Sequence, residues 1–373
     1  MNLHSHLPTA LSGPAERVLG WDLLRGMCAF AVAAYHLMFW QDLASIHTLG
    51  SYGVYLFFVL SGASLAYNYV DKMQSGRFSW PQFLWVRYLR LAPLYLALML
   101  IALPWKVLNL GLSTDLLTLY LLNATFLFGF FNPSMNAVLV GGWSLGIEAI
   151  YYLLFPLLMM SFARLWLVIT VFVLLLVTQI AWIAGSVGQG GYNLENTALY
   201  FQAPAFAAYF MGGCILGVVK RKKLWRSFPH PQTALIILLT GFGLMIVLNP
   251  VFAGDEITGW RGFVLGGMCL VMVYAASCWV VPDHMVNLAR YFGDATYGLY
   301  LLHPVLFFGM VQIVFPRLGI SHPGDWAVSS RILFGAAIIV LAFGLALLSE
   351  RYFENPLRTL LKSRHNKARE TMG

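Results

Sequence analysis

Long apolar runs recur along the whole chain, and short polar segments separate them. Each run approaches the roughly 20 residues that a helix needs to cross about 30 Å of hydrocarbon. The runs leave no room for a sizeable soluble domain. The pattern predicts an all-α integral membrane protein, a bundle of about ten transmembrane helices. The expected spans are Leu23–Phe39, Tyr52–Tyr69, Leu91–Leu110, Trp143–Phe162, Leu165–Ala184, Ala198–Val219, Thr233–Leu248, Gly262–Val280, Ala295–Val314 and Ile332–Leu348.

The distribution of basic residues predicts which loops face the cytoplasm. Basic clusters follow the second and sixth spans and form the C-terminal tail, whereas Gln41–Ser51 and Gly185–Thr197 contain no Lys or Arg. Because cytoplasmic loops carry an excess of Lys and Arg, both ends of the chain are expected in the cytoplasm. Only an even number of crossings between the first two clusters satisfies this bias. An eleventh apolar run, Leu116–Phe131, is therefore predicted to be a re-entrant or interfacial segment on the outer side. The basic clusters are Lys72, Arg77, Arg87 and Arg90; Lys220, Arg221, Lys222, Lys223 and Arg226; and Arg358, Lys362, Arg364, Lys367 and Arg369.

The same pattern divides the chain into three parts: a cytoplasmic N-terminal segment (residues 1–16), a transmembrane domain (17–357) and a basic cytoplasmic tail (358–373). Pro356 is expected to prevent the last helix from continuing, because proline lacks the backbone N–H that a helix uses. The first apolar run begins near Trp21, is long and has no small-residue cleavage site after it. We therefore expect a retained span there rather than a cleavable signal peptide.

Composition narrows the class further. Hydrophobic residues make up 60% of the chain and charged residues 10%, whereas a soluble chain has about 25% charged residues. The formal net charge of +8 comes from residues between apolar runs and at the C-terminus, so membrane topology explains it better than nucleic-acid binding, and lipids are the expected surroundings. The four cysteines all lie inside apolar runs without metal-ligand spacing. Neither a disulfide framework nor a metal site is expected.

The first predicted helix carries three ionisable residues in the run Trp21–Trp40, which is otherwise apolar enough to cross a bilayer. Arg25 and His36 are about three helical turns apart, so they share one face and lie about 16 Å from each other along the axis. Asp22, three residues before Arg25, is placed to hold its guanidinium. Ionisable groups at such depth are costly and usually functional. The alternatives are that Arg25 reaches lipid headgroups and that His36 is a hydrogen-bonded core histidine.

A carboxylate enters the membrane in a second stretch, GGWSLGIEAIYYLLFP at Gly141–Pro156. Glu148 lies about five residues into a span that runs inward from outside, at about the depth of His36. A buried carboxylate near an imidazole orients it and raises its basicity, which suits a general base. The alternative is that Glu148 is a hydrogen-bond partner between helices.

A pair of arginines lies in a third stretch, WVRYLRLAPLY at Trp85–Tyr95, on the predicted cytoplasmic side. Arg87 and Arg90 are three residues apart and share a helix face, where their forked donors suit phosphate oxygens. Contact with lipid headgroups is the alternative.

Two further helices carry polar residues near mid-membrane. His303 precedes Pro304, which can free a backbone carbonyl, and Tyr300 lies one turn earlier. His303 is interpreted either as a site residue or as a core histidine with its hydrogen bonds satisfied. Tyr300 is interpreted as a residue that packs there or lines a path through the bundle. Ser61 and Gly62 are interpreted as small residues that allow close helix packing.

Taken together, these stretches resemble the motifs of membrane-bound acyltransferase family 3, a group of polysaccharide O-acyltransferases and related bacterial enzymes. The resemblance covers nearly the whole chain. Its most specific element is an arginine, ten residues and a histidine in the first helix. The chain departs from the family at Leu23, where Gly is frequent, and at Ala63, where Phe is frequent. The matching stretches are Arg25 to His36, FFVLSG at Phe57–Gly62, RxxRxxPxY at Arg87–Tyr95, WSLxxE at Trp143–Glu148, YGLYLLH at Tyr297–His303 and ENP at Glu354–Pro356.

The resemblance implies a multi-pass protein of the bacterial inner membrane that transfers an acyl group, most often acetyl, from cytoplasmic acyl-CoA to a hydroxyl of an extracytoplasmic glycan or similar acceptor. Some members carry a fused esterase-like domain that this chain lacks. The chain is therefore expected to act alone, as a homo-oligomer or with a separate periplasmic partner. The implied roles are His36 as catalytic histidine with Glu148 as its partner, Arg25, Arg87 and Arg90 as acyl-CoA contacts, and Asp22, Tyr300 and His303 as supporting residues.

The spacing suggests how such a reaction crosses the bilayer. In this hypothesis the arginines bind the CoA phosphates, the pantetheine arm extends through the bundle, and His36 acts as general base on the acceptor hydroxyl. A carrier for a lipid-linked or acidic small molecule would use the same buried charges, although inverted repeats are absent from the sequence. An acyl-CoA sensor without turnover is a third reading. The sequence leaves open the acceptor, the acyl group, the oligomeric state, and whether transfer is direct or passes through an acyl-His36.

Overall fold

The computed structural model describes residues 16–75, 79–187, 198–224 and 230–370. This part of the chain contains helices and no strand. Nine of its helical segments are long and apolar enough to cross a membrane, and a tenth apolar helix, Gln232–Val247, is shorter. The predicted all-α membrane bundle is confirmed. The α-helices are α1 (Leu19–Trp40), α2 (His47–Gln74), α3 (Trp80–Leu110), α4 (Thr114–Ala124), α5 (Pro133–Asn136), α6 (Trp143–Ser161), α7 (Leu165–Ser186), α9 (Ala207–Arg221), α10 (Pro231–Val247), α11 (Gly259–Cys278), α12 (Val286–Gly309), α13 (Phe315–Leu318), α14 (Val328–Ser349) and α15 (Asn355–Glu370).

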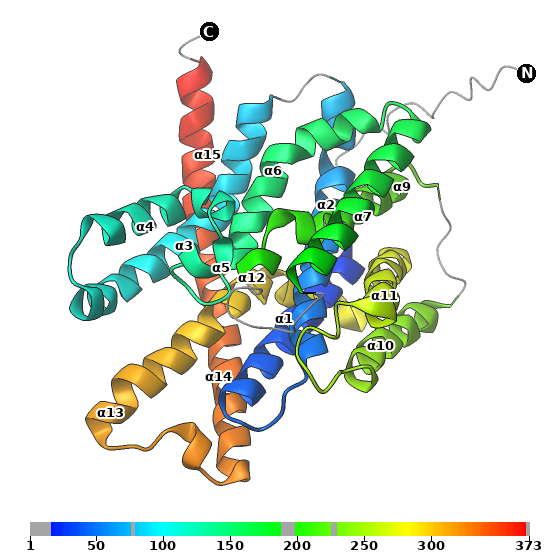
Figure 1. Cartoon of the computed structure of the whole chain (residues 1–373). Helices are drawn as coiled ribbons and strands as arrows, with labels where there is room; N and C mark the ends of the chain where they lie inside the picture. Colours follow the sequence, from blue (N-terminus) through cyan, green and yellow to red (C-terminus); the bar gives the residue numbers. More distant parts are fainter. Residues whose placement is uncertain (1–15, 76–78, 188–197, 225–229, 371–373) are drawn as a thin grey trace, which may run out of the picture.

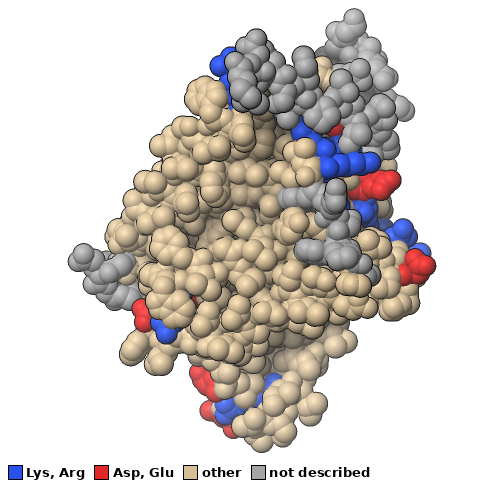
Figure 2. Space-filling view, turned by 90° about the vertical axis from the view of Figure 1, so that its right-hand side faces the viewer, with Lys and Arg blue, Asp and Glu red and all other residues tan. Residues whose placement is uncertain are grey.

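Helix α1 lies inside the bundle and packs against α2, α11, α12 and α14 (Figure 1). Its apolar side chains Leu24, Cys28 and Val32 have no exposed surface. By contrast, α7 exposes most of its apolar side chains, as a helix does when hydrocarbon is its solvent. On the face in Figure 2, uncharged residues make up most of the surface and charged residues gather toward its margins.

Glycines allow a close helix crossing between α2 and α9. A Cβ on Gly62 would clash with the backbone of α9, and one on Gly213 or Gly217 would clash with the backbone of α2. This small-xxx-small spacing lets two backbones approach where hydrocarbon provides no hydrophobic force between helices. The predicted packing role of Gly62 is confirmed.

The eleventh apolar run does not form a spanning helix. Residues 116–131 contain all but the first two residues of α4 and a short 3₁₀ turn, Leu127–Phe130. The 11 residues of α4 extend only about 16 Å at about 1.5 Å per residue, roughly half the hydrocarbon thickness. In Figure 1, α4 folds back beside α3 at the periphery of the bundle.

Two proline-containing helices differ from expectation. Helix α3 starts at Trp80 and continues through Pro93 and Pro104, so the arginine stretch and the span that follows form one helix. The prediction that Pro356 prevents further helix is wrong: a π-helical turn, Glu350–Glu354, joins α14 directly to α15. Pro356 is the second residue of α15, where its missing N–H disrupts least, and the π turn absorbs the change in hydrogen-bond register. The three segments form one column in Figure 1.

Candidate active site

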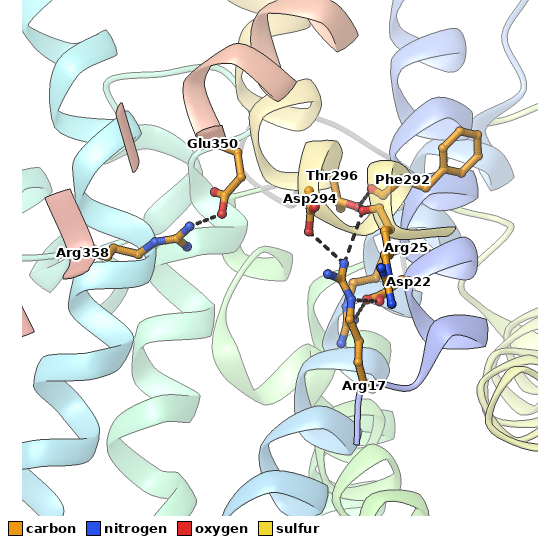
Figure 3. A network of polar contacts seen from close by, with 9 residues as sticks. Arg17, Asp22, Arg25, Phe292, Asp294, Thr296, Glu350 and Arg358 are labelled. Carbon is orange, nitrogen blue, oxygen red and sulfur yellow. Dashed lines mark hydrogen bonds and ion pairs between the residues drawn. The ribbon is translucent and has the colours of Figure 1, made fainter. Parts of the chain in front are cut away.

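The amino-terminal end of α1 carries a network of ion pairs, shown in Figure 3. Asp22 accepts from Arg25 Nη1 at 2.9 Å and from Arg17 Nε at 2.5 Å, and Arg17 Nη2 reaches Asp294 Oδ1 at 2.8 Å. The second terminal nitrogen of Arg25 donates to the Ser64 hydroxyl of α2. Asp22 therefore holds the Arg25 guanidinium, as its i, i+3 spacing predicted, and the network fixes α1 against α2 and α12.

Arg87 lies in a cage of aromatic rings. Its guanidinium is 5.1 Å from the ring centre of Tyr69, 5.8 Å from that of Phe83 and 5.9 Å from that of Tyr152. It donates to the Tyr69 hydroxyl at 2.8 Å, while its buried Nε has no hydrogen-bond partner among the described residues. Cation–π contact stabilises the charge and orients the planar fork.

Arg90 is exposed and differs from its neighbour in having no hydrogen bond or ion pair with any described residue. It lines two cavities at once, one deeper in the bundle and one beside the network of Figure 3. An unpaired guanidinium that faces two adjoining cavities is available to an anionic ligand in either.

The deeper of these two spaces, which we call the deep cavity, has a volume of about 120 Å³. It brings together all three arginines that sequence reasoning singled out, and it also contains Glu148. Its polar lining comes from five helices: Arg25 of α1; Ser61 and Ser64 of α2; Arg87 and Arg90 of α3; Ser144, Glu148 and Tyr152 of α6; and Thr296, Tyr297 and Tyr300 of α12.

The second space, the charged cavity, has a volume of about 250 Å³ and shares Arg25, Arg90 and Tyr297 with the deep cavity. Arg358 of α15 pairs with Glu350 on one side of it (Figure 3). Equal numbers of guanidinium and carboxylate groups surround this space. The arginines are Arg17, Arg25, Arg90 and Arg358, and the carboxylates are Asp22, Asp294, Glu350 and Glu354.

Glu148 has different partners from the one expected. Its Oε1 accepts from the Ser61 hydroxyl at 2.7 Å and from the Tyr152 hydroxyl. The hydrogen bond of His36 goes instead to His303, with 3.0 Å between His36 Nδ1 and His303 Nε2. The structure thus places Glu148 with the arginines, and places the two histidines together. Ser61, interpreted from the sequence as a packing residue, is a hydrogen-bond donor to this carboxylate.

The histidine pair is held by aromatic stacking. The His36 ring lies 4.8 Å from the ring of Trp40 at an angle of 2°, and 5.3 Å from the ring of His303 at 17°. His303 is 1% exposed, and its Nδ1 lies 2.9 Å from the Leu299 carbonyl oxygen. His36 is partly exposed. It is the more exposed member of the pair.

Tyr300 connects the two groups. It lines the deep cavity, and its ring centre is 6.3 Å from that of His303. Its hydroxyl donates to the Gly141 carbonyl at 2.9 Å and lies 2.9 Å from the Ser144 hydroxyl oxygen. Gly141 has a φ of +79°, which favours glycine, so the start of the GGWSLGIE stretch is shaped to meet this tyrosine.

Sequence reasoning missed several polar neighbours of the arginines. Ser64 and Tyr152 carried a usable signal, since they lie one helical turn after Ser61 and Glu148 and therefore share their faces. Arg17 and Asp294 gave no such signal, because more than 270 positions separate them (|i−j| = 277). In the described part of the chain, all four cysteines are buried and free, and no group of His, Cys, Asp and Glu side chains could hold a metal ion.

The arginines, the carboxylate and the histidine pair inside an apolar bundle define a membrane protein with a polar reaction or transport site. A family model described as an acyltransferase domain matches residues 18–351. The chain belongs to this family, membrane-bound acyltransferase family 3, and is a multi-pass membrane protein.

Three curated relatives match over most of the chain. Peptidoglycan O-acetyltransferase OatA of Listeria monocytogenes is 24% identical over 365 residues, covering 90% of this chain and 55% of OatA. Acyltransferase MdmB of Streptomyces mycarofaciens is 26% identical, covering 91% of this chain and 92% of MdmB. Putative peptidoglycan O-acetyltransferase YrhL of Bacillus subtilis is 27% identical, covering 91% of this chain and 55% of YrhL. The chain thus spans about half the length of two of them. No solved structure matches significantly.

Proposed function

We propose that this chain is a transmembrane O-acyltransferase that moves an acyl group, in the simplest case acetyl, from cytoplasmic acyl-CoA to a hydroxyl of an extracytoplasmic glycan or glycan-like acceptor. The observation that supports this proposal is the arrangement of the site. A cavity with three arginines lies next to a histidine pair, and Tyr300 is in contact with both. In this proposal both chain ends and the charged cavity face the cytoplasm of a bacterial cell, and the partly exposed His36 faces the outside.

The arginines supply the donor-binding half of the proposal. Arg90 is unpaired among the described residues, and Arg25 and Arg87 each direct a guanidinium into the same cavity. Forked guanidinium groups bind phosphate oxygens in pairs, and such charge-assisted bonds are about twice as strong as neutral ones. The charged cavity lies beside them, and in the proposal it admits the phosphate-bearing end of CoA.

The histidine supplies the chemical half. His36 removes the proton from the acceptor hydroxyl, whose oxygen attacks the thioester carbonyl. The carbon–sulfur bond then breaks, and the departing CoA thiolate takes up the proton that His36 holds. The products are an ester and free CoA thiol. General base catalysis of this kind typically contributes about 10² to 10⁴-fold.

The relatives support an acyl acceptor outside the cytoplasm. Two of them carry the name of a peptidoglycan O-acetyltransferase, one as putative, and peptidoglycan is a polymer of the cell wall. The chain covers 55% of each of these two but 92% of the acyltransferase MdmB. A glycan acceptor is therefore part of the proposal, and its identity is a matter for experiment.

The test is acyl transfer by the purified protein in detergent, with acetyl-CoA as donor and soluble peptidoglycan fragments as acceptor. Free thiol release and acetyl ester formation are measured together with acetyl-CoA binding. His36→Ala is expected to abolish transfer and leave binding intact. His284→Ala, a substitution at an exposed histidine, is the matched control and is expected to retain both.

Two outcomes would contradict the proposal. Full transfer by His36→Ala would remove the base from the mechanism. The carrier would instead be favoured if the protein bound acetyl-CoA but released no thiol with any acceptor tested, and if it transported an acidic solute into vesicles.

A further inference from the structure

The hydrogen bonds of the histidine pair form a chain in which the donor and acceptor of each bond can be assigned. The chain runs from the Leu299 carbonyl to His303 Nδ1, and from His303 Nε2 to His36 Nδ1. A neutral imidazole has one N–H donor and one acceptor nitrogen, so each bond decides the role of the next. The direction of the chain decides which nitrogen of His36 can act as a base.

The first link begins at an atom that only accepts. A carbonyl oxygen has no proton, so the 2.9 Å contact requires the proton on His303 Nδ1. Pro304 strengthens this end, because its missing N–H leaves the neighbouring Tyr300 carbonyl without a backbone donor from that position. The Tyr300 carbonyl oxygen therefore remains an available acceptor at that backbone position, one residue after the Leu299 carbonyl that His303 Nδ1 contacts.

The second link follows from burial. His303 is 1% exposed, and its hydrogen-bond partners among the described residues include no carboxylate. A charged imidazole without a counter-ion is costly in such surroundings, so His303 is neutral and its Nε2 is an acceptor. His36 Nδ1, 3.0 Å away, must then carry the proton and donate it.

We propose that His303 is the positioning residue of His36: it fixes His36 in the tautomer with its proton on Nδ1, so that the lone pair lies on Nε2 and faces the acceptor hydroxyl. This inference rests on the proposed function, in which His36 is the base. Stacking of Trp40 on His36, with 2° between the ring planes, holds the imidazole in the plane that this bond requires. A carboxylate commonly orients a catalytic histidine; here a second imidazole, anchored to a backbone carbonyl, takes that place.

The same hydrogen bonds account for the path of the proton from the acceptor hydroxyl to the departing CoA thiolate. When His36 Nε2 takes the hydroxyl proton, the resulting imidazolium still donates through Nδ1 to His303 Nε2. The positive charge is stabilised by that bond, and the proton on Nε2 leaves with the CoA thiolate. No group outside the proposed reaction is needed.

The first test is nuclear magnetic resonance of the protein labelled with ¹⁵N-histidine, with the two histidines assigned by single substitutions. Nitrogen shifts distinguish protonated from bare ring nitrogens. The expected result is a proton on Nδ1 and a bare Nε2 in both His36 and His303. A proton on Nε2 of His36 in the wild-type protein would overturn the inference.

The second test compares two substitutions of the same residue. His303→Leu removes the acceptor, and His303→Gln places an amide oxygen close to the position of Nε2. In serine proteases, a partner that favours the wrong tautomer costs about 10⁴-fold in kcat. Leu favours neither tautomer, so we expect a loss of about 10- to 1000-fold in kcat, an acetyl-CoA Kd within about twofold of wild type, and partial recovery with Gln. His47→Leu, at a partly buried histidine bonded to Tyr35, is the control and should keep kcat.

The outcomes separate the inference from the function on which it rests. Full kcat in His303→Leu would refute the positioning role, and so would a loss that Gln does not relieve while the His36 tautomer is unchanged. Full transfer by His36→Ala would refute the proposed base itself. An inactive His36→Ala with a fully active His303→Leu would leave the proposed function standing and remove only this inference.

Discussion

Replacing Arg25 by Gln tests the donor-binding half of the proposal most directly. The Arg25 side chain is 17% exposed, donates to Asp22 at 2.9 Å and to Ser64, and lines both cavities. Loss of Arg25 does not leave Asp22 unpaired, because Arg17 Nε remains 2.5 Å from its other oxygen. The glutamine amide can still donate toward Ser64. The fold is therefore expected to survive, which makes the binding measurement interpretable.

The magnitude follows from the kind of contact that is lost. A hydrogen bond to a charged group contributes about 1.5–3 kcal/mol. At about 1.4 kcal/mol per tenfold change, loss of one such bond from Arg25 to a CoA phosphate weakens donor binding about 10- to 100-fold. Arg25→Lys keeps the charge but not the fork, so it is expected to lie between Gln and wild type.

The assay is isothermal titration of acetyl-CoA into the purified protein in nanodiscs, at two salt concentrations, with thermal unfolding measured in parallel. Arg331→Gln is the matched control. Arg331 also lies next to α1, where it donates to the carbonyls of Trp326 at 2.8 Å and Gln41 at 3.0 Å, but it lines neither cavity. The control should keep its Kd within twofold. An unchanged Kd in folded Arg25→Gln would refute the assignment of this cavity to the donor.

Three further outcomes are expected. Gly213→Ala should lower the melting temperature in detergent, since its Cβ would clash with the backbone of α2 and overpacking costs about 1–3 kcal/mol, whereas Gly243→Ala, with nothing within 4 Å, should not. Tyr152→Phe removes one of the two hydroxyls bonded to Glu148 and should reduce transfer about tenfold, while the Ser61 hydroxyl remains as the other donor; unchanged transfer would show that the Tyr152 bond is dispensable. Arg90→Gln should weaken acetyl-CoA binding and reduce its dependence on salt, and an identical salt slope would count against a phosphate contact.

The sequence predicted the elements of this fold well because their signal is local. Spans of about 20 apolar residues are set by the thickness of the hydrocarbon, so nine of the ten predicted spans coincide with long apolar helices and the tenth with the shorter α10. The eleventh apolar run was correctly distinguished from the spans, since α4 is too short to cross the hydrocarbon. The continuation through Pro356 was not predictable in the same way, since a π-helical turn depends on how α14 and α15 pack against their neighbours.

The sequence predicted the site only in part, because it gives the depth of a residue in the membrane but not the neighbours of its side chain. Counting residues along α1 and α6 placed His36 and Glu148 at similar heights, but height does not decide which neighbour a side chain faces. In the structure α12 lies against α1 and supplies His303, while α2 and α6 contribute Ser61 and Tyr152 to Glu148. His303 and Ser61 come from helices far away in the sequence (|i−j| = 267 for His36 and His303, 87 for Ser61 and Glu148), so spacing within one helix carries no information about them. Tyr152, four residues after Glu148 on α6, is the partner that this spacing could have indicated.

The separation of the two halves limits how the donor can be used. Arg25 and His36 lie about 16 Å apart along α1, at about 1.5 Å per residue. Phosphates held at Arg25 therefore cannot touch His36, and moving them through the apolar middle of the bundle would expose several charges to a large desolvation penalty. A thioester on a long neutral arm avoids that penalty, because only the arm has to pass Tyr300. A carrier for a lipid-linked or acidic small molecule would have to move the charged group itself, and for that reason the same arrangement of arginines and histidines favours the proposed acyl transfer over transport.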